Sequence, residues 1–141
     1  IASKMPLSST LDTIEKSKNN LPLAQNFVDR AGSTNKINII FGSAEDILAQ
    51  STKVYDLIFL DADKIYYEQL MNLSVDRLET GGILFVDNLL WKGYVVEDNL
   101  PNNLINSTNI VKDFNKKFME HPNLDAKIYP IGDGIGIAVK K

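Results

Sequence analysis

Two acidic residues and an amide follow two short apolar runs of the sequence, and together they offer oxygen ligands to a cation. Residues 55–60 end at Asp61, and residues 82–86 end at Asp87 and Asn88. An oxygen-only set with two anionic members suits Mg²⁺ or Ca²⁺ and does not suit zinc or copper. The pattern predicts a divalent-cation site, most naturally for Mg²⁺. Helix capping by Asp61 and an Asx-turn at Asp87 are the alternatives.

Lys64 follows Asp61 closely and is a candidate general base. A lysine beside a dication has its ammonium form disfavoured, so it can accept a proton near neutral pH. A solvated lysine is the alternative, and Asp63 is interpreted as a helix cap. Trp91 follows the second acidic turn and can form a wall of a pocket for a flat substrate, although packing explains it equally well.

Glu15 and a run of three small residues are candidates for binding a cofactor. Glu15 ends a strand-like run, where an acid commonly accepts hydrogen bonds from the ribose hydroxyls of a nucleotide-like cofactor. Gly42, Ser43 and Ala44 follow the run 37–41, and their small side chains would let an adenine ring approach the backbone. Both features are also ordinary turn chemistry.

Strand-like and helix-like segments alternate along the chain, which is typical of a parallel sheet with helices on its faces. The continuously apolar strands suit burial on both faces. A closing antiparallel hairpin is predicted because Gly132-Asp133-Gly134 is a tight-turn signal between two strand-like runs. The sequence predicts strands at 10–14, 37–41, 56–60, 82–86, 126–131 and 135–139, helices near 22–31, 45–49, 67–78 and 110–118, a stop at Gly81-Gly82, and a polar loop over 92–108.

The composition fits a single globular domain spanning 1–141. The chain has 141 residues, is 44% hydrophobic and 23% charged, and carries a net charge of −3. It has no cysteine, which excludes disulfides, thiolate catalysis and zinc–thiolate sites. No basic block indicates non-specific nucleic-acid or membrane binding, and no run is long enough to span a bilayer. A cytoplasmic protein is the simplest interpretation.

Three motifs resemble those of a known family. Residues 55–64, 81–91 and 130–134 resemble the metal-dependent O-methyltransferases that use S-adenosylmethionine, of the caffeoyl-CoA and catechol type. The resemblance covers almost the whole chain, with the motifs in order. It implies an α/β fold, the Rossmann-like class I methyltransferase fold, with a mostly parallel sheet that ends in an antiparallel hairpin.

The resemblance also implies roles for individual residues. It gives Asp61, Asp87 and Asn88 as metal ligands and Lys64 as the proposed base, while Asp61 would also lie near the methionine part of the cofactor. It gives Glu15 as the ribose-binding acid and the turn 42–44 as the adenine side of the cofactor site. Methyl transfer to a hydroxyl of a catechol-like phenol, or of hydroxyuridine in tRNA, is the implied reaction, in a full-length protein that forms a homodimer.

The sequence begins at Ile1, and it lacks the glycine-rich loop that holds the methionine end of the cofactor in the family. We expect that loop and the family's first strand to precede Ile1, so that this chain is the C-terminal part of an O-methyltransferase domain. On this view activity belongs to the longer protein, and the fragment alone would be inactive. A nicotinamide-dependent oxidoreductase and a non-catalytic binding or assembly module are the alternative functions.

Overall fold

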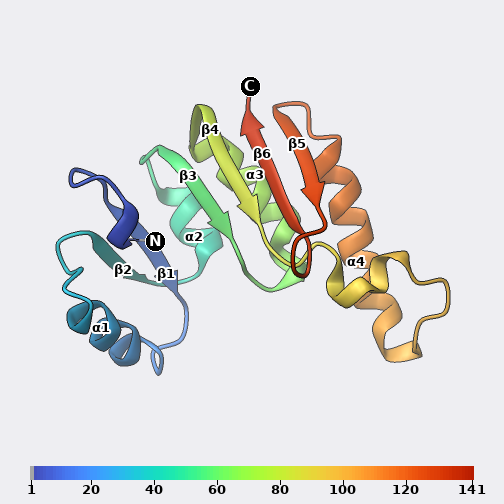
Figure 1. Ribbon diagram of the computed structural model, residues 1–141, viewed down its shortest axis with the longest axis horizontal. Coiled ribbons are helices and arrows are strands. Elements are labelled where there is room, and N and C mark those ends of the chain that lie inside the picture. The colour runs from blue at the N-terminus through green and yellow to red at the C-terminus, as the bar shows by residue number, and fades with distance from the viewer. Residues whose placement is uncertain (1) are drawn as a thin grey trace. The chain divides into compact units, whose positions relative to one another are not determined.

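The computed structural model describes residues 2–141, which divide into two compact units, one up to residue 50 and one from residue 51 onward. In the first unit, strands β1 (Leu11–Glu15) and β2 (Ile37–Phe41) pair in parallel (Figure 1). Ile14 is opposite Ile40. The two strands and two helices predicted in this unit are confirmed, with ends shifted by at most one residue. The elements are η1 (Ala2–Lys4), β1 (Leu11–Glu15), α1 (Leu21–Arg30), β2 (Ile37–Phe41) and α2 (Ala44–Gln50).

The second unit contains a mixed four-stranded sheet of β3 (Tyr55–Leu60), β4 (Leu78–Val86), β5 (Leu124–Tyr129) and β6 (Ile135–Lys140). The strand order is β3-β4-β6-β5. Strands β3 and β4 are parallel, whereas β6 pairs antiparallel with both β4 and β5. This arrangement confirms the predicted parallel pair and closing hairpin, but the strands form two hydrogen-bonded sheets instead of one. The elements are β3 (Tyr55–Leu60), η2 (Lys64–Tyr66), α3 (Tyr67–Arg77), β4 (Leu78–Val86), η3 (Trp91–Val96), α4 (Asn102–Met119), β5 (Leu124–Tyr129) and β6 (Ile135–Lys140).

The predicted glycine stop after α3 is wrong. The helix ends at Arg77 and β4 begins at Leu78, so Gly81 and Gly82 lie inside the strand. The register against β3 shifts in this region, and Gly81 has a φ of +83°, a left-handed conformation that favours glycine. The glycines therefore shape an irregular strand instead of terminating a helix.

The predicted loop over 92–108 is also wrong in its second half, because α4 begins at Asn102. The many asparagines of this segment favoured a loop, but the segment also has the residue spacing of a helix with one buried face. On that face Leu104 is half-buried, and Thr108 and Val111 are buried. Residues three or four apart share one helix face, so this spacing continues the apolar face predicted further along. Residues 2–141 contain no helix with the length and apolar character that a membrane crossing requires.

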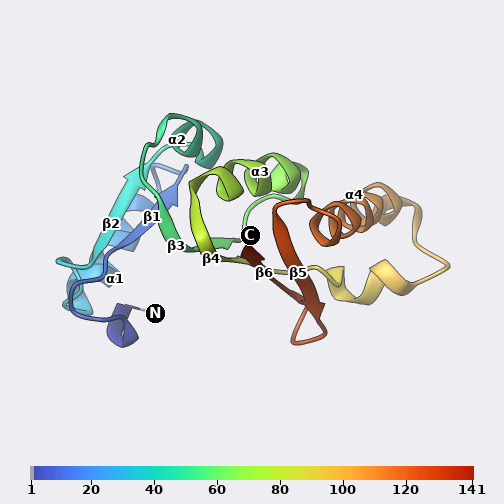
Figure 2. The same cartoon turned by 90° about the horizontal axis from the view of Figure 1, so that it is seen from above.

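Within the second unit, helices α3 and α4 lie on the same face of the sheet (Figure 2). They bury Leu84 and Val86 of β4, and Tyr67 of α3 meets Phe114 of α4 edge-on, with ring centroids 5.1 Å apart. On the opposite face, three side chains, those of Leu57, Phe59 and Val139, are 49%, 54% and 41% exposed. The prediction of strands buried on both faces therefore fails within residues 51–141, because the helices of this unit cover only one face.

The hairpin turn between β5 and β6 offers a matched pair of glycines. Gly132 and Gly134 have φ values of +59° and +84°, so an alanine at either position is strained by about 1–2 kcal/mol. A Cβ on Gly132 meets nothing, whereas one on Gly134 would lie 2.6 Å from the backbone nitrogen of Leu90. The hairpin turn therefore packs tightly against the segment that follows β4.

We expect Gly134→Ala to lower the free energy of unfolding by roughly 2–5 kcal/mol, because overpacking adds about 1–3 kcal/mol to the backbone strain of about 1–2 kcal/mol. Gly132→Ala should cost only about 1–2 kcal/mol, from the strain alone. Urea unfolding followed by the fluorescence of the single tryptophan measures both. Equal losses in the two variants would contradict the close approach of Gly134 to Leu90.

Candidate functional site

The two predicted acids follow neighbouring strand ends. Leu60 is opposite Val86 in the parallel pair β3–β4, so Asp61 and Asp87 each follow their strand at the same edge of the sheet. The backbone N–H of Asp87 donates to the carbonyl of Leu60 over 3.2 Å, which extends the pairing by one residue. The carboxyl ends of parallel strands are where ligands bind in open α/β sheets.

Asn88 continues this edge in an unusual backbone conformation. Its φ is +58°, a left-handed value that asparagine tolerates better than most residues. The backbone N–H of Asn88 donates to the Asp87 carboxylate over 2.7 Å. Its side-chain Oδ1 accepts a hydrogen bond from Lys64 Nζ at 3.0 Å. The bond to the Asp87 carboxylate joins neighbouring residues, whereas the bond of an Asx-turn reaches the N–H two residues on, and the Leu89 N–H bonds to Gly134 instead. The Asn88 amide oxygen is directed at a cation, the Lys64 ammonium.

Lys64 begins the short helix η2, and its ammonium is the positive charge of the site. It donates to Asn88 Oδ1 and to the hydroxyl of Tyr67. Partial burial lowers the pKa of Lys64 below its usual value of 10.5, and the carboxylates of Asp61 and Asp87 oppose that shift. The alternative of a solvated lysine is wrong, because this side chain is half-buried and bonded on both sides.

Tyr67 also belongs to this cluster, although the sequence pattern did not indicate it as a site residue. Its side chain is 1% exposed, and its hydroxyl donates to the backbone carbonyl of Asp87 over 3.2 Å while accepting from Lys64. Burial and the nearby Asp61 raise the pKa of Tyr67 well above its usual range, so the hydroxyl stays protonated. The signal available in the sequence was its position one helical turn after Lys64, which puts the two on one face.

The residues at this edge fit a hard divalent cation by their chemistry. Two carboxylates and an amide oxygen form an oxygen-only donor set, and their surroundings already hold one cation, the Lys64 ammonium. Residues 2–141 contain no group of three or more His, Cys, Asp or Glu that could hold a metal. A site at Asp61, Asp87 and Asn88 therefore relies on two acids, one amide and oxygens supplied by water or substrate.

The predicted cofactor-binding residues of the first unit share an edge of their own sheet. The N–H of Gly42 donates to the carbonyl of Glu15 over 3.2 Å, so the ends of β1 and β2 are adjacent. The Glu15 carboxylate accepts from the Ser17 N–H at 2.7 Å and from the Asn20 amide at 3.1 Å, and these bonds lower its pKa. Ser43 caps α2, with its hydroxyl accepting from a backbone N–H.

Ala44 is the first residue of α2, directly after Gly42 and Ser43. The structure thus brings Glu15 and the turn 42–44 together, as expected for one end of a nucleotide site. Their roles toward a cofactor stay predictions. Asp61, the remaining residue predicted to lie near the cofactor, belongs to residues 51–141 and is described with them.

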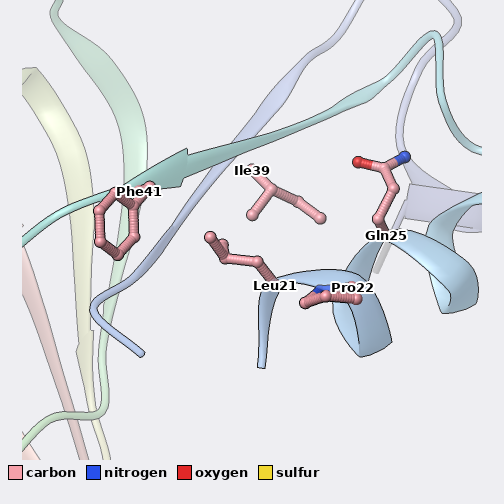
Figure 3. A pocket seen from close by; sticks show the side chains of 5 residues that line it. All are labelled: Leu21, Pro22, Gln25, Ile39 and Phe41. Carbon is pink, nitrogen blue, oxygen red and sulfur yellow. The ribbon is translucent and has the colours of Figure 1, made fainter. Parts of the chain in front are cut away.

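An open hollow of about 340 Å³ lies between α1 and β2 in the first unit (Figure 3). Apolar side chains and one amide line it, and none of them belongs to the predicted site. The lining residues are Leu21, Pro22, Gln25, Ile39 and Phe41. Trp91 begins η3, after the second acidic turn, and its indole N–H is buried without a hydrogen-bond partner among the described residues. Its role in the wall of a substrate pocket stays a prediction.

The environment of Lys64 makes its titration a direct test of this geometry. In protein freed of divalent ions by a chelator, the Lys64 pKa should lie below 10.5. Asp61→Asn should lower it further, because the variant removes a charge that favours the ammonium. Between the folded and unfolded pKa values, the unfolded chain binds more protons, so the free energy of unfolding rises with pH. The NMR shift of Lys64 Cε measures the pKa, and a rise in Asp61→Asn would contradict the arrangement.

Known proteins share both the sequence pattern and the fold of this chain. The chain is 31% identical over 143 residues to the caffeoyl-CoA O-methyltransferase of Populus kitakamiensis, a match that covers 93% of this chain and 59% of that protein. It is 29% identical over 150 residues to the catechol O-methyltransferase of Niastella koreensis, covering 100% of this chain and 66% of that protein. The chain thus spans about three fifths of the length of the poplar protein.

The fold matches that of a solved enzyme. The structure of the O-methyltransferase from Bacillus cereus, solved in complex with SAH, has a TM-score of 0.85 at 23% identity, and the match covers 99% of this chain and 66% of that chain. This likeness shows the fold, an α/β fold with a mixed sheet that matches class I methyltransferases. The family model described as O-methyltransferase matches residues 1–141. The chain belongs to the O-methyltransferase family.

Proposed function

We propose that this chain carries the cation-binding part of an enzyme that moves a methyl group from S-adenosylmethionine to a hydroxyl of a catechol-like phenol. One observation carries the proposal. In a chain that matches the O-methyltransferase family over its whole length, the two strand-end acids, the amide of Asn88 and the ammonium of Lys64 gather at one edge of the sheet. The names of the relatives support a phenolic acceptor, since they specify caffeoyl-CoA and catechol.

In this proposal Asp61, Asp87 and Asn88 hold a divalent cation, Mg²⁺ by preference. A bound cation of this kind polarises neighbouring hydroxyl oxygens of a catechol and lowers the pKa of the accepting hydroxyl. Two carboxylates would balance the two charges of the cation, so the site would carry no excess negative charge to repel a substrate that becomes an anion when it loses its proton. The amide of Asn88 adds an oxygen without adding further negative charge.

Lys64 is the proposed proton acceptor, with Tyr67 holding it in place. The hydroxyl proton of the phenol passes to Nζ of a neutral Lys64, and the phenolate oxygen forms a bond to the methyl carbon as the bond from that carbon to sulfur breaks. S-adenosylhomocysteine leaves as the neutral thioether. The protein's main contribution is to hold the oxygen and the methyl group in line, because such orientation supplies much of the rate of a two-substrate reaction.

Glu15 and the turn 42–44 are proposed to bind the ribose and the adenine of the cofactor. The Glu15 carboxylate is ionised, since its pKa is lowered, and it can accept hydrogen bonds from ribose hydroxyls. A nicotinamide cofactor would use such an acid in the same way, but the family match favours S-adenosylmethionine over that alternative. A cytoplasmic location and a homodimer of the full-length protein complete the proposal.

The test is methyl transfer in the longest natural polypeptide that contains these residues, because the chain spans only 59% of the poplar relative. Catechol and caffeoyl-CoA should be methylated in Mg²⁺, and a chelator should abolish turnover. Asp87→Asn should lower kcat/KM by at least about 100-fold, since losing a ligand should exceed the 10–100-fold cost of losing a residue that only supports one.

The matched control is Asp76→Asn, which removes an exposed carboxylate from α3 and should leave turnover unchanged. Full activity in Asp87→Asn, or in the presence of the chelator, would overturn the cation assignment. Methylation of hydroxyuridine in tRNA with no turnover of phenols would overturn the proposed acceptor. No methyl transfer to either class by a protein that binds S-adenosylmethionine would favour the binding module.

A further inference from the structure

The segment that carries Asn88 is held in a backbone conformation that it would not adopt alone. Asn88, Trp91 and Lys92 have φ values of +58°, +50° and +57°, and they are the non-glycine residues with positive φ in the part of the chain that the structure describes. Such values are disfavoured for residues with a Cβ and persist only where the surroundings impose them. Something outside the segment therefore sets its shape.

The turn between β5 and β6 is one source of this constraint. The N–H of Leu89 donates to the carbonyl of Gly134 over 3.0 Å, and the N–H of Leu90 donates to the carbonyl of Asp133 over 2.8 Å. The Asp133 carboxylate accepts a short hydrogen bond from the backbone N–H of Lys92. Since Gly134 also leaves no room for a Cβ beside Leu90, the turn and the segment fit closely.

Helix α4 supplies the second constraint through Asn115. Its side-chain Nδ2 donates to the carbonyl of Leu89 over 2.7 Å, and the Leu89 side chain is 0% exposed. The peptide group between Leu89 and Leu90 is thus bonded on both sides, by Asn115 at its oxygen and by Asp133 at its nitrogen. Neither residue has a part in the proposed reaction.

We propose that Asn115 and Asp133 are positioning residues that fix the direction of the Asn88 side chain. The peptide group before Asn88 donates its N–H to the Asp87 carboxylate, and the peptide group after it donates the Leu89 N–H to Gly134. Asn115 and the Asp133 carbonyl hold the following peptide group, between Leu89 and Leu90, and so keep Leu89 in place to make its bond to Gly134. With both planes set, φ and ψ of Asn88 are set, and its Oδ1 faces Lys64. The consequence for cation binding rests on the proposed function, whereas the constraint on the segment does not.

Hydrogen exchange of the Leu89 and Leu90 amides in chelator-treated protein tests the constraint without a metal. Asn115→Ala should speed exchange at both by about tenfold, because it leaves a buried carbonyl without its donor. Asn109→Ala, on an exposed position of the same helix, is the matched control and should change neither amide. Unchanged exchange at Leu89 and Leu90, or equal acceleration at Leu84 in the core of β4, would overturn the proposal.

Asp133 provides a second, independent variant pair. Asp133→Ala removes the acceptor for the Lys92 N–H and should speed exchange at that amide, whereas Asp133→Asn keeps an acceptor oxygen, loses the charge and should retain protection. Loss of protection in both variants would show that charge, and not the hydrogen bond, holds the segment.

Mn²⁺ affinity, measured by electron paramagnetic resonance, tests the consequence. Asn115→Ala should weaken it by about 10–100-fold, the range for residues that orient a ligand, while Asn109→Ala should leave it unchanged. A wild-type chain that binds no Mn²⁺ would defeat the cation site under the proposed function, and the exchange comparison would still decide the constraint. Wild-type affinity in Asn115→Ala would overturn the positioning role.

Discussion

The parallel pairing of β3 with β4 is the constraint on which the site depends. Because Leu60 is opposite Val86, the residues that follow the two strands emerge at one edge, and the bond from the Asp87 N–H to the Leu60 carbonyl holds them there. Two carboxylates brought together repel each other unless a cation accompanies them. The Lys64 ammonium meets that need in the structure, and it lies close enough to Asp61 and Asp87 for both to affect its pKa. The same charge balance explains why a divalent cation suits this edge.

Tyr67 couples this charge balance to the hydrophobic core. Its ring packs edge-on against Phe114, whose neighbour Phe118 stacks in turn, while its hydroxyl reaches both Lys64 and the backbone of Asp87. A buried hydroxyl needs partners, since a buried polar group left unpaired is costly. The core of the second unit therefore fixes the Lys64 ammonium through Tyr67, whose aromatic ring is rigid. Because Tyr67 already holds it, the flexible Lys64 side chain loses little further conformational freedom in the site.

The sequence predicted those parts of the fold and the site that local patterns determine. Apolar runs located β3 and most of β4, and the acids that follow them are adjacent in sequence to those runs. Gly81 and the start of α4 were misjudged because their roles depend on tertiary contacts: the register against β3 decides the first, and burial of Thr108 decides the second. Tyr67 matched the apolar stripe of a predicted helix. That pattern accounts for its buried ring but does not predict the hydrogen bonds of its hydroxyl. Asn115 could not be found from spacing, because its partner lies 26 residues away.

The strand order explains how residues so distant in sequence reach the site. Because β6 lies between β4 and β5, the turn that precedes β6 meets the segment that follows β4, and Asp133 bonds to Lys92 across 41 residues. A hairpin added at the outer edge in the order β4-β5-β6 would put that turn elsewhere. The sequence of the turn between β5 and β6 therefore has two requirements. The turn itself needs residues that adopt positive φ, and the contact with Leu90 needs a residue without a Cβ at position 134. The second requirement is specific to this topology, and it links the closing hairpin to the chemistry at the ends of the parallel strands.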